Sequence, residues 1–509
     1  MRKMLPVISL TLVLIFSVST AFASNGTQIG TVGTRPTAMG SSFRGLADDW
    51  SALFWNPAGL TQLDSKWTIG TSVGLIMPSG SYTPLPYPAQ MAPFSGMYTD
   101  QRDLVDRKFI VPAMGVFYKA TEKLTAGLGV YAPFGLGTEW DLMMIPESYG
   151  SLSDLKENEH YSDHQVLCIQ PTLAYEISDK LSVGLGASYI MGSMTLDMAR
   201  TMFNPVLADN GWAALQQGAA AIQMLNPQFP DLPGLTADQN RIPVGVNMEG
   251  DGSTFGVNAG LLFKVSEKLQ IGLSAQYYAD LTLKGTFKQT AYFPGDPVKY
   301  GVLEALAGAL ASVPGQEETI AGIQQAMWLF TGQNMVMQGD VEAKMPLPMT
   351  FGAGIAYMPT EKLTLTLDAG MTQWNSWDVI TIKPTDEGSE VEEDELREDW
   401  ESTLQFGLGI EYKAMKQLSV LGGFYTVPSP APDKTLTPTI LDPSRRYVIT
   451  GGLQYGVGSL LFSGTFEYLI FDDKTVESYI FDDMGIAENY AGDYSFSALV
   501  FTGGVSIAL

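Results

Sequence analysis

The sequence predicts an all-β protein, a 14-stranded antiparallel transmembrane β-barrel with an N-terminal hatch inside its lumen. Three observations predict this fold. Strand-length segments from residue 66 onward alternate apolar residues with small or polar ones. Short turns alternate with long polar connections, and an export signal precedes both. We therefore expect a signal peptide over 1–23, a hatch over 24–65, and a barrel with long extracellular loops over 66–509.

The N-terminus has the three parts of a secretory signal. Arg2 and Lys3 precede an apolar run from Leu5 to Val18, and Ala21-Phe22-Ala23 offers a small-x-small cleavage site before Ser24. The run is shorter than the roughly 20 residues that a membrane-spanning helix needs. Cleavage removes two of the 29 basic residues and none of the 54 acidic ones, so the net charge falls from −25 to −27.

Charge and cysteine content exclude two classes of protein. The acidic balance argues against nucleic acid as a partner, because nucleic acid binding needs clustered Lys and Arg. The single cysteine, Cys168, excludes an intrachain disulfide framework, and we expect it to be a small residue of the barrel wall.

The predicted hatch is centred on Ala47 to Leu60. Asp48 and Asp49 open this segment, an aromatic cluster fills its middle, and Asn56-Pro57-Ala58-Gly59 closes it with a turn. A compact, turn-rich segment placed before a long series of strands is typical of a plug for the volume that the strands enclose.

The strands are recognised by apolar residues at every second position, which make one face of each strand apolar. The opposite face carries small or polar residues, such as Ser182, Gly184 and Gly186 in the fifth strand. In the third strand the apolar positions are the even numbers up to Phe134. An even number of strands is what a closed antiparallel barrel requires. The predicted segments are 66–77, 110–118, 124–134, 167–177, 181–189, 255–263, 269–277, 351–357, 363–369, 404–410, 418–424, 447–455, 460–468 and 499–509.

Connection lengths distinguish a barrel from a soluble sandwich, whose apolar faces would point to a core. Tight turns such as Ser178-Asp179 and Ser266-Glu267 alternate with long polar connections. Short turns at one end and long loops at the other are typical of outer-membrane barrels. The predicted loops are 78–108, 135–163, 201–251, 288–346, 384–399, 428–444 and 471–493.

Three segments carry a family resemblance: ADDWSALFWNPAGL from Ala47, GLGVYAPFGLGTEW from Gly127, and FYTVPSPAPDKTLTPTILDPSRRYVITGGLQY from Phe424. With them the mature chain resembles the outer-membrane transporters of long-chain fatty acids and aromatic hydrocarbons (FadL/TodX-like, OMPP1). The resemblance implies a monomer that takes up a hydrophobic small molecule by diffusion, without energy coupling. It also implies lateral release into outer-membrane lipid through a gap where the third strand kinks.

Gating residues follow from the same resemblance. Pro133 lies in the third strand, where it lacks the N–H of a ladder bond, and Phe134 and the flexible Gly135 follow it. A plain strand end at Pro133 is the alternative. The resemblance implies that Asn56, Pro57 and Ala58 form a hatch motif against this kink, unless they are only a structural turn. Asp48 and Asp49 would bond backbone amides or wall cations, or cap the next turn.

Candidate ligand-binding residues lie in two helical stretches and near the C-terminus. The resemblance implies that the stretches form an outer groove for the ligand; packing on each other to cap the barrel is the alternative. Arg446 points inward by parity and matches the family's arginine, with Arg445 as second choice, although it could instead neutralise Glu411 or Glu467. A neutral hydrocarbon therefore remains an alternative to a fatty acid. The helical residues are Trp212, Leu215 and Ile222 within 211–225 and Ile323, Met327 and Trp328 within 319–330.

Enzymatic and metal sites are weakly indicated. His160 and His164, the two histidines, lie among Glu157, Glu159 and Asp163, which we interpret as a charged surface loop. The acidic stretch from Glu387 to Glu401 is interpreted as a solvated loop. An outer-membrane lipid hydrolase would need a histidine beside a nucleophile, and no such motif is present. The hatch argues against an open porin, so we expect a transporter without a cofactor.

Overall fold

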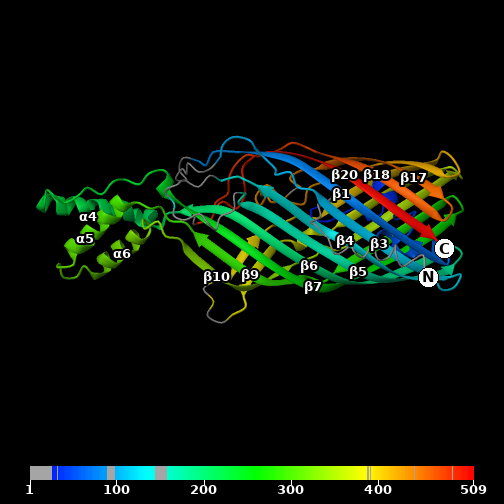
Figure 1. Ribbon diagram of the computed structural model, residues 1–509, viewed down its shortest axis with the longest axis horizontal. Coiled ribbons are helices and arrows are strands. Elements are labelled where there is room, and N and C mark those ends of the chain that lie inside the picture. Colours follow the sequence, from blue (N-terminus) through cyan, green and yellow to red (C-terminus); the bar gives the residue numbers. More distant parts are fainter. Residues whose placement is uncertain are drawn as a thin grey trace.

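The computed structural model describes residues 26–509 apart from 31, 89–97, 144–148, 150–157, 387, 388, 390, 392, 441 and 484, so the predicted signal peptide lies outside the described residues. It confirms the closed 14-stranded antiparallel barrel (Figure 1). The sheet closes because β1 pairs with both β3 and β20. The wall strands are β1 (Trp67–Pro84), β3 (Phe109–Lys119), β4 (Leu124–Trp140), β5 (His160–Ser178), β6 (Leu181–Phe203), β7 (Arg241–Ser266), β8 (Leu269–Tyr278), β11 (Thr350–Thr360), β12 (Leu363–Thr372), β15 (Thr403–Lys413), β16 (Leu418–Val427), β17 (Arg446–Val457), β18 (Leu460–Phe471) and β20 (Gly492–Ala508).

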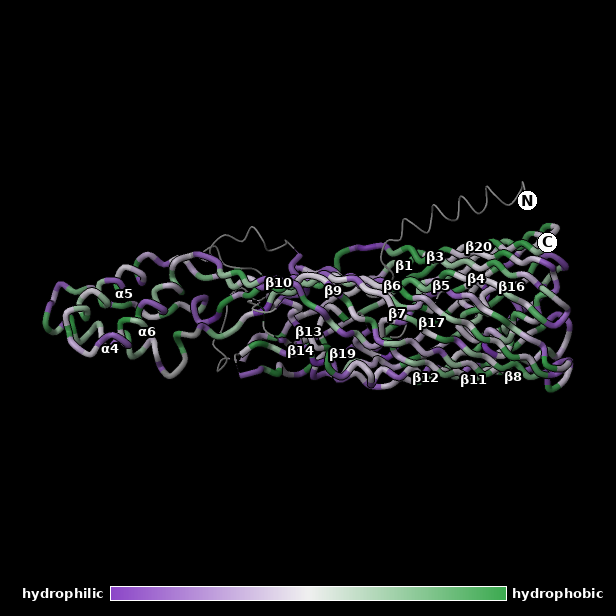
Figure 2. The backbone as a smooth tube through the Cα atoms, turned by 90° about the horizontal axis from the view of Figure 1, so that it is seen from below, coloured by the Kyte–Doolittle hydropathy of each residue, from purple (hydrophilic) through white to green (hydrophobic). Residues whose placement is uncertain are grey.

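The predicted alternation is reproduced in the wall. Leu185 is 57% exposed and Phe255 is 69% exposed, whereas Ser182 and Ser188 on the other face are buried. Figure 2 shows hydrophobic and hydrophilic positions following one another along the strands. An apolar outer face with small and polar residues inside is the pattern of a barrel surrounded by lipid.

A repeated sequence closes several short turns at the end where the C-terminus lies. The Oγ1 of Thr121 accepts hydrogen bonds from the backbone N–H groups of Lys123 and Leu124. Ser178, Ser266 and Thr360 accept from the lysine two residues later in the same way. The hydroxyl replaces a backbone partner that the turn lacks, which explains why Thr or Ser recurs there before Lys-Leu.

At the other end, the wall is longer than the predicted strands. The strands β6 and β7 run for 23 and 26 residues, well beyond the roughly 10 that cross a bilayer. Further strands extend this end: β9 (Leu281–Ala291), β10 (Met335–Met345), β13 (Val379–Pro384) and β14 (Asp394–Arg397). The prediction of long polar loops over 201–251, 288–346 and 384–399 is therefore wrong in part, because strands as well as the predicted helices lie within these ranges. The strand segments that extend beyond the lipid have water on their outer face. Their outward residues need not be apolar, so these segments lack the alternation of apolar and polar residues that identifies strands in lipid.

The hatch lies inside the wall and consists of three short helices, α2 (Thr34–Ala38), α3 (Ala52–Trp55) and η1 (Pro57–Gln62). Arg35 pairs with Glu411 of β15 at 2.6 Å. Asp368 of β12 accepts hydrogen bonds from the backbone N–H groups of Phe43 and Arg44, at 3.0 and 2.8 Å. Buried charge-assisted bonds of this kind fix the hatch against the barrel.

Three helices, α4 (Gly211–Leu225), α5 (Pro297–Leu310) and α6 (Glu317–Trp328), project beyond the long-connection end of the barrel (Figure 1). The helix predicted over 211–225 is confirmed, and the one over 319–330 begins two residues earlier, while α5 was not predicted. Among the described residues, no helix combines the length and the apolar character that a membrane crossing requires.

Candidate functional site

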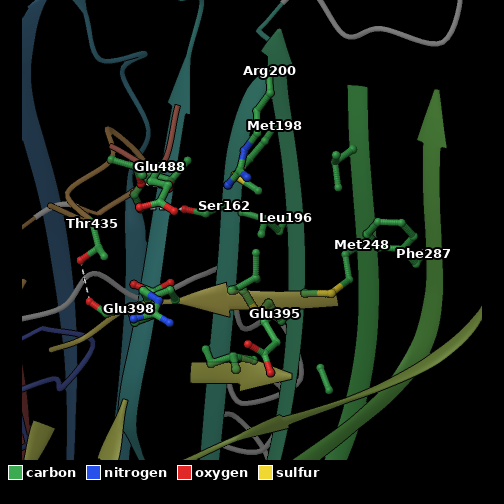
Figure 3. A pocket seen from close by; sticks show the side chains of 18 of the residues that line it. Ser162, Leu196, Met198, Arg200, Met248, Phe287, Glu395, Glu398, Thr435 and Glu488 are labelled. Atoms are coloured by element: carbon green, nitrogen blue, oxygen red, sulfur yellow. Dashed lines mark hydrogen bonds between the residues drawn. The ribbon is translucent and has the colours of Figure 1, made fainter. Parts of the chain in front are cut away.

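A cavity of about 640 Å³ lies between the hatch and the extended end of the barrel. β5, β6, β7, β9, β10 and β14 contribute to its lining, and Thr27 of the hatch closes part of it. Figure 3 shows Leu196, Met198 and Arg200 of β6 at this cavity, together with Met248 and Phe287 from other strands. The volume falls within the range of small-molecule sites.

The middle of the cavity is apolar and adaptable. Five methionines line it, and methionine side chains fit variable apolar shapes because they are flexible and polarizable. Aromatic and aliphatic side chains complete the surface. The methionines are Met194, Met198, Met248, Met337 and Met345, and the other apolar residues include Leu196, Leu283, Phe287, Trp377 and Trp400.

Arg200 supplies a positive charge without a carboxylate partner in the described part of the chain. Its Nε is buried and has no hydrogen-bond partner there, and its Nη2 contacts the Sδ of Met198 at 3.8 Å. The second arginine of the lining, Arg397, is more exposed and lies 3.9 Å from Asp399. Arg200 is therefore the cation that is available to an anionic group in the cavity.

Among the described residues, six carboxylates also line the cavity, and one of them, Glu398, has a raised pKa. Glu398 belongs to the connection between β14 and β15, outside the wall strands that cross the membrane. Desolvation by burial raises the pKa of Glu398 to about 7, although Trp400 and Arg200 act in the opposite direction. Its protonation therefore changes near neutral pH. The other carboxylates are Asp163, Glu393, Glu395, Asp482 and Glu488.

The third wall strand, β4, has a bulge at Pro133. The pairing of β4 with β5 shifts between Tyr131 and Phe134, so two residues of β4 face one of β5. The ladder between β3 and β4 ends at Ala113 and Tyr131, although β3 continues to Phe109. Beyond Tyr131, to the end of β4, the regular ladder of hydrogen bonds between β3 and β4 is therefore absent.

The bulge also corrects one expectation. Phe134 was predicted on the outward row, but it is 0% exposed and lies in the core, 5.6 Å from the ring of Tyr278. The extra residue in the bulge reverses the parity of β4, so Phe134 turns inward.

The start of the hatch covers the bulge from inside. Ile29 donates its N–H to the carbonyl of Pro133, and Gly135 donates to the carbonyl of Thr27, both at 2.8 Å. Gln28 and Phe134 form the bridge between these two bonds. Residues 27–29, which we call the latch, thus take the place beside β4 that β3 leaves.

Asn56, Pro57 and Ala58 lie elsewhere, which corrects their predicted position against the kink. The Asn56 side chain donates to the carbonyls of Arg44 and Leu261, and its Oδ1 accepts from Ala58. A Cβ at Gly184 or Gly260 would collide with Pro57 or Asn56. The motif is therefore packed against β6 and β7, because the wall glycines there leave room for a tight turn.

Asp48 and Asp49 both act within the hatch. Asp48 pairs with Arg35 at 2.5 Å, and Asp49 accepts hydrogen bonds from the N–H and the hydroxyl of Ser51, at 2.8 and 2.5 Å. Asp49 thus caps the turn that follows it, and Asp48 joins the ion pair that anchors the hatch to Glu411.

Arg446 does point inward, but it does not line the cavity. It is 0% exposed and lies 3.2 Å from Asp442, which also accepts the N–H of Gly26 at 2.9 Å. Arg446 therefore neutralises a buried carboxylate, as the alternative prediction held, with Asp442 rather than Glu411 or Glu467 as its ion-pair partner. Arg445 is exposed on the outer face.

The predicted ligand-contacting residues of the helices also lie away from the cavity. Trp212 and Ile323 are buried in a small core shared by α4, α5 and α6, against which Leu215, Ile222 and Met327 pack. Trp328 packs edge-on against Phe293, with ring centroids 4.8 Å apart. These residues hold the helices together, which is the simpler of the two predicted roles.

The two histidines have different surroundings. His160 lies between Glu159, at 2.9 Å from Nδ1, and the hydroxyl of Tyr490, at 2.7 Å from Nε2. His164 lines the cavity. Within the described residues neither histidine bonds a serine hydroxyl, and no group of three or more His, Cys, Asp or Glu side chains is arranged to hold a metal ion.

Sequence reasoning missed Arg200 and Glu398. Arg200 has the same even-number parity as the inward residues of β6, so extending the strand to Arg200 would have placed it inside. No sequence signal indicated Glu398, because it lies in an acidic stretch that also contains exposed residues such as Glu393 and Glu395.

The chain is similar in sequence and in fold to known outer-membrane proteins. Residues 15–508 match the family described as "Outer membrane protein transport protein (OMPP1/FadL/TodX)". A FadL homologue from Pseudomonas aeruginosa has a similar fold, with a TM-score of 0.69 at 16% identity, covering 95% of this chain and 99% of that one. The toluene transporter TodX from Pseudomonas putida matches with a TM-score of 0.61 at 15% identity, covering 96% and 100%. A Neisseria meningitidis protein designated NMB0088 is 33% identical over 130 residues, 24% of this chain and 27% of its own length.

Proposed function

The chain belongs to the outer membrane transport family OMPP1/FadL/TodX, and on that premise we propose that it takes up long-chain fatty acids or similar hydrophobic molecules. The ligand enters from the long-connection end, binds in the cavity and leaves sideways at the bulge of β4, without energy input. The observation that supports the proposal is the largely apolar cavity lined by Arg200, whose Nε lacks a partner among the described residues, with the latch between it and the bulge.

Two features favour an amphipathic acid over a neutral hydrocarbon. The Nε of half-buried Arg200 is itself buried and has no partner in the described part of the chain, and a buried donor of this kind is costly unless a ligand accepts its hydrogen bond. The cavity follows β6 from Met194 to Arg200, about 20 Å of strand, which suits an elongated chain. A neutral aromatic hydrocarbon is the second candidate, favoured by the six carboxylates of the lining.

Replacing Arg200 by methionine tests the choice between these ligands. We expect Arg200→Met to weaken binding of hexadecanoate at least about tenfold, because a hydrogen bond to a charged group contributes about 1.5–3 kcal/mol. Binding of an alkylbenzene of similar length should change little. Displacement of a fluorescent ligand from purified protein in detergent measures both. Arg445→Met, on the outer face, is the control; equal losses for acid and hydrocarbon in Arg200→Met would show that no carboxylate binds there.

The pKa of Glu398 predicts a pH dependence. Below pH 7 its carboxyl group is protonated and neutral, and above pH 7 it becomes an anion that competes with the ligand for Arg200. A fatty acid carboxylate is charged throughout, so its affinity should fall roughly tenfold between pH 6 and pH 8. The same displacement assay in Glu398→Gln should give a flat profile. If the affinity of Glu398→Gln still falls between pH 6 and pH 8, a group other than Glu398 causes the pH dependence.

A further inference from the structure

The end of the cavity next to the bulge holds two buried polar side chains without partners. His164 is 3% exposed and Thr27 is 1% exposed, and both line the cavity. Within the described chain, both ring nitrogens of His164 and the Oγ1 of Thr27 lack a hydrogen-bond partner. Buried polar groups are almost always hydrogen-bonded, so two unpartnered ones at the same end of a ligand cavity are available to a polar group of the ligand.

These side chains flank the same stretch of β4. Thr27 accepts the N–H of Gly135 on one edge of β4, and His164 is the register partner of Leu136 on the other edge. His160, four residues earlier on the same face, has both nitrogens bonded and does not line the cavity. Of the two histidines, the one without hydrogen-bond partners is thus the one that lines the cavity.

The chemistry of this end requires a neutral polar group. A neutral imidazole has one donor and one acceptor, and a threonine hydroxyl can do either. Apart from His164, Arg200 and Arg397 are the basic residues of the described lining. His164 pairs in register with Met194, so Arg200 lies six residues further along β6, about 20 Å away. Arg107, which donates to the carbonyl of Ser162 near this end, already pairs with Asp163 at 3.2 Å. A second anion would therefore compete with Asp163 for it, whereas a hydroxyl can donate and accept at once.

Resting on the proposed function, we propose that Thr27 and His164 form a second polar subsite that binds a hydroxyl at the far end of an amphipathic acid. The preferred ligand is then a long-chain acid oxygenated near its ω end, held by Arg200 at the carboxylate and by this subsite at the hydroxyl. The hydroxyl would lie directly beside the latch.

The test compares hexadecanoate with 16-hydroxyhexadecanoate as competitors of a fluorescent fatty acid on the purified full-length mature protein in detergent. The quantity is the ratio of their dissociation constants. We expect the preference for the hydroxy acid to fall about tenfold in His164→Leu and in the isosteric Thr27→Val. His164→Gln, which keeps a donor and an acceptor, should retain most of it.

Thr502→Val is the matched control. Thr502 is 2% exposed and its hydroxyl likewise lacks a partner in the described structure, but it lies on β20 and does not line the cavity. Its ratio should equal that of the wild type. An unchanged ratio in both His164→Leu and Thr27→Val would overturn the subsite while leaving the proposed function intact. Failure of either acid to displace the probe from the wild type would overturn both.

Discussion

Deleting Pro133 is expected to stop uptake while leaving ligand binding unchanged. The deletion removes the extra residue of the bulge, so the pairing of β4 with β5 becomes continuous and β4 can pair with β3 beyond Tyr131. Each new ladder bond contributes about 0.5–1.5 kcal/mol, so a few of them raise the cost of opening by about 2 kcal/mol or more. Uptake of a labelled fatty acid into lipid vesicles should then fall more than about tenfold.

The control for this deletion is a bulge at the opposite end of the barrel. The pairing of β7 with β8 shifts between Lys264 and Ser266, close to a short turn. Deletion of Val265 removes an irregularity of similar size without touching β4, and uptake should remain near the wild-type rate. If the Pro133 deletion transports as fast as the Val265 deletion, release through the β4 bulge is contradicted.

Substitution of Asp368 should release the hatch and open the barrel to ions. Asp368 accepts from the backbone N–H groups of Phe43 and Arg44 and lies 3.5 Å from the Arg44 guanidinium. Asp368→Ala leaves the N–H groups of Phe43 and Arg44 without their acceptor and removes the carboxylate beside the half-buried Arg44 guanidinium, at a cost of about 3–5 kcal/mol to the docked hatch. Planar-bilayer recordings should therefore show frequent channel openings, where the intact protein shows few.

Glu467 provides the matched substitution for Asp368. It is an equally buried wall carboxylate, 3% exposed, and it accepts from the hydroxyl of Tyr425 of the wall. Glu467→Ala should leave conductance unchanged. Equal conductance in the two variants would mean that Asp368 does not hold the hatch.

The sequence predicts the membrane-crossing wall well because lipid imposes a strict rule there. Outward positions such as Leu185, Phe255 and Leu367 must be apolar, so the period of two is visible even in single strands. The short turns are equally predictable, since Thr121, and Ser or Thr at the same place in other turns, accepts a hydrogen bond that stabilises the turn. Both features depend on neighbours in the chain or on the solvent, and not on distant residues.

The site was less predictable because its geometry depends on distant contacts. Parity showed correctly that Arg446 points inward, but not that Asp442 and the hatch already occupy it. Parity also applies to Arg200, whose position at the cavity depends on β9, β10 and β14, strands that the sequence did not reveal. The bulge at Pro133 reversed the parity for Phe134, because one inserted residue changes every position after it.

A reversible lock on the latch tests the central claim most directly. Gln28 and Phe134 form a non-hydrogen-bonded antiparallel pair, flanked by the Ile29–Pro133 and Thr27–Gly135 bonds. Such pairs bring Cα atoms to about 4.5 Å, within the range of a disulfide. Gln28→Cys with Phe134→Cys, in a Cys168→Ser background, would join the latch to β4 on oxidation.

Uptake into vesicles by this double-cysteine protein, measured before and after reduction, is the decisive experiment. The oxidised protein should bind hexadecanoate but transport it more than about tenfold more slowly than the reduced protein, because the latch can no longer leave the bulge. Equal rates in the oxidised and reduced states would contradict release past residues 27–29.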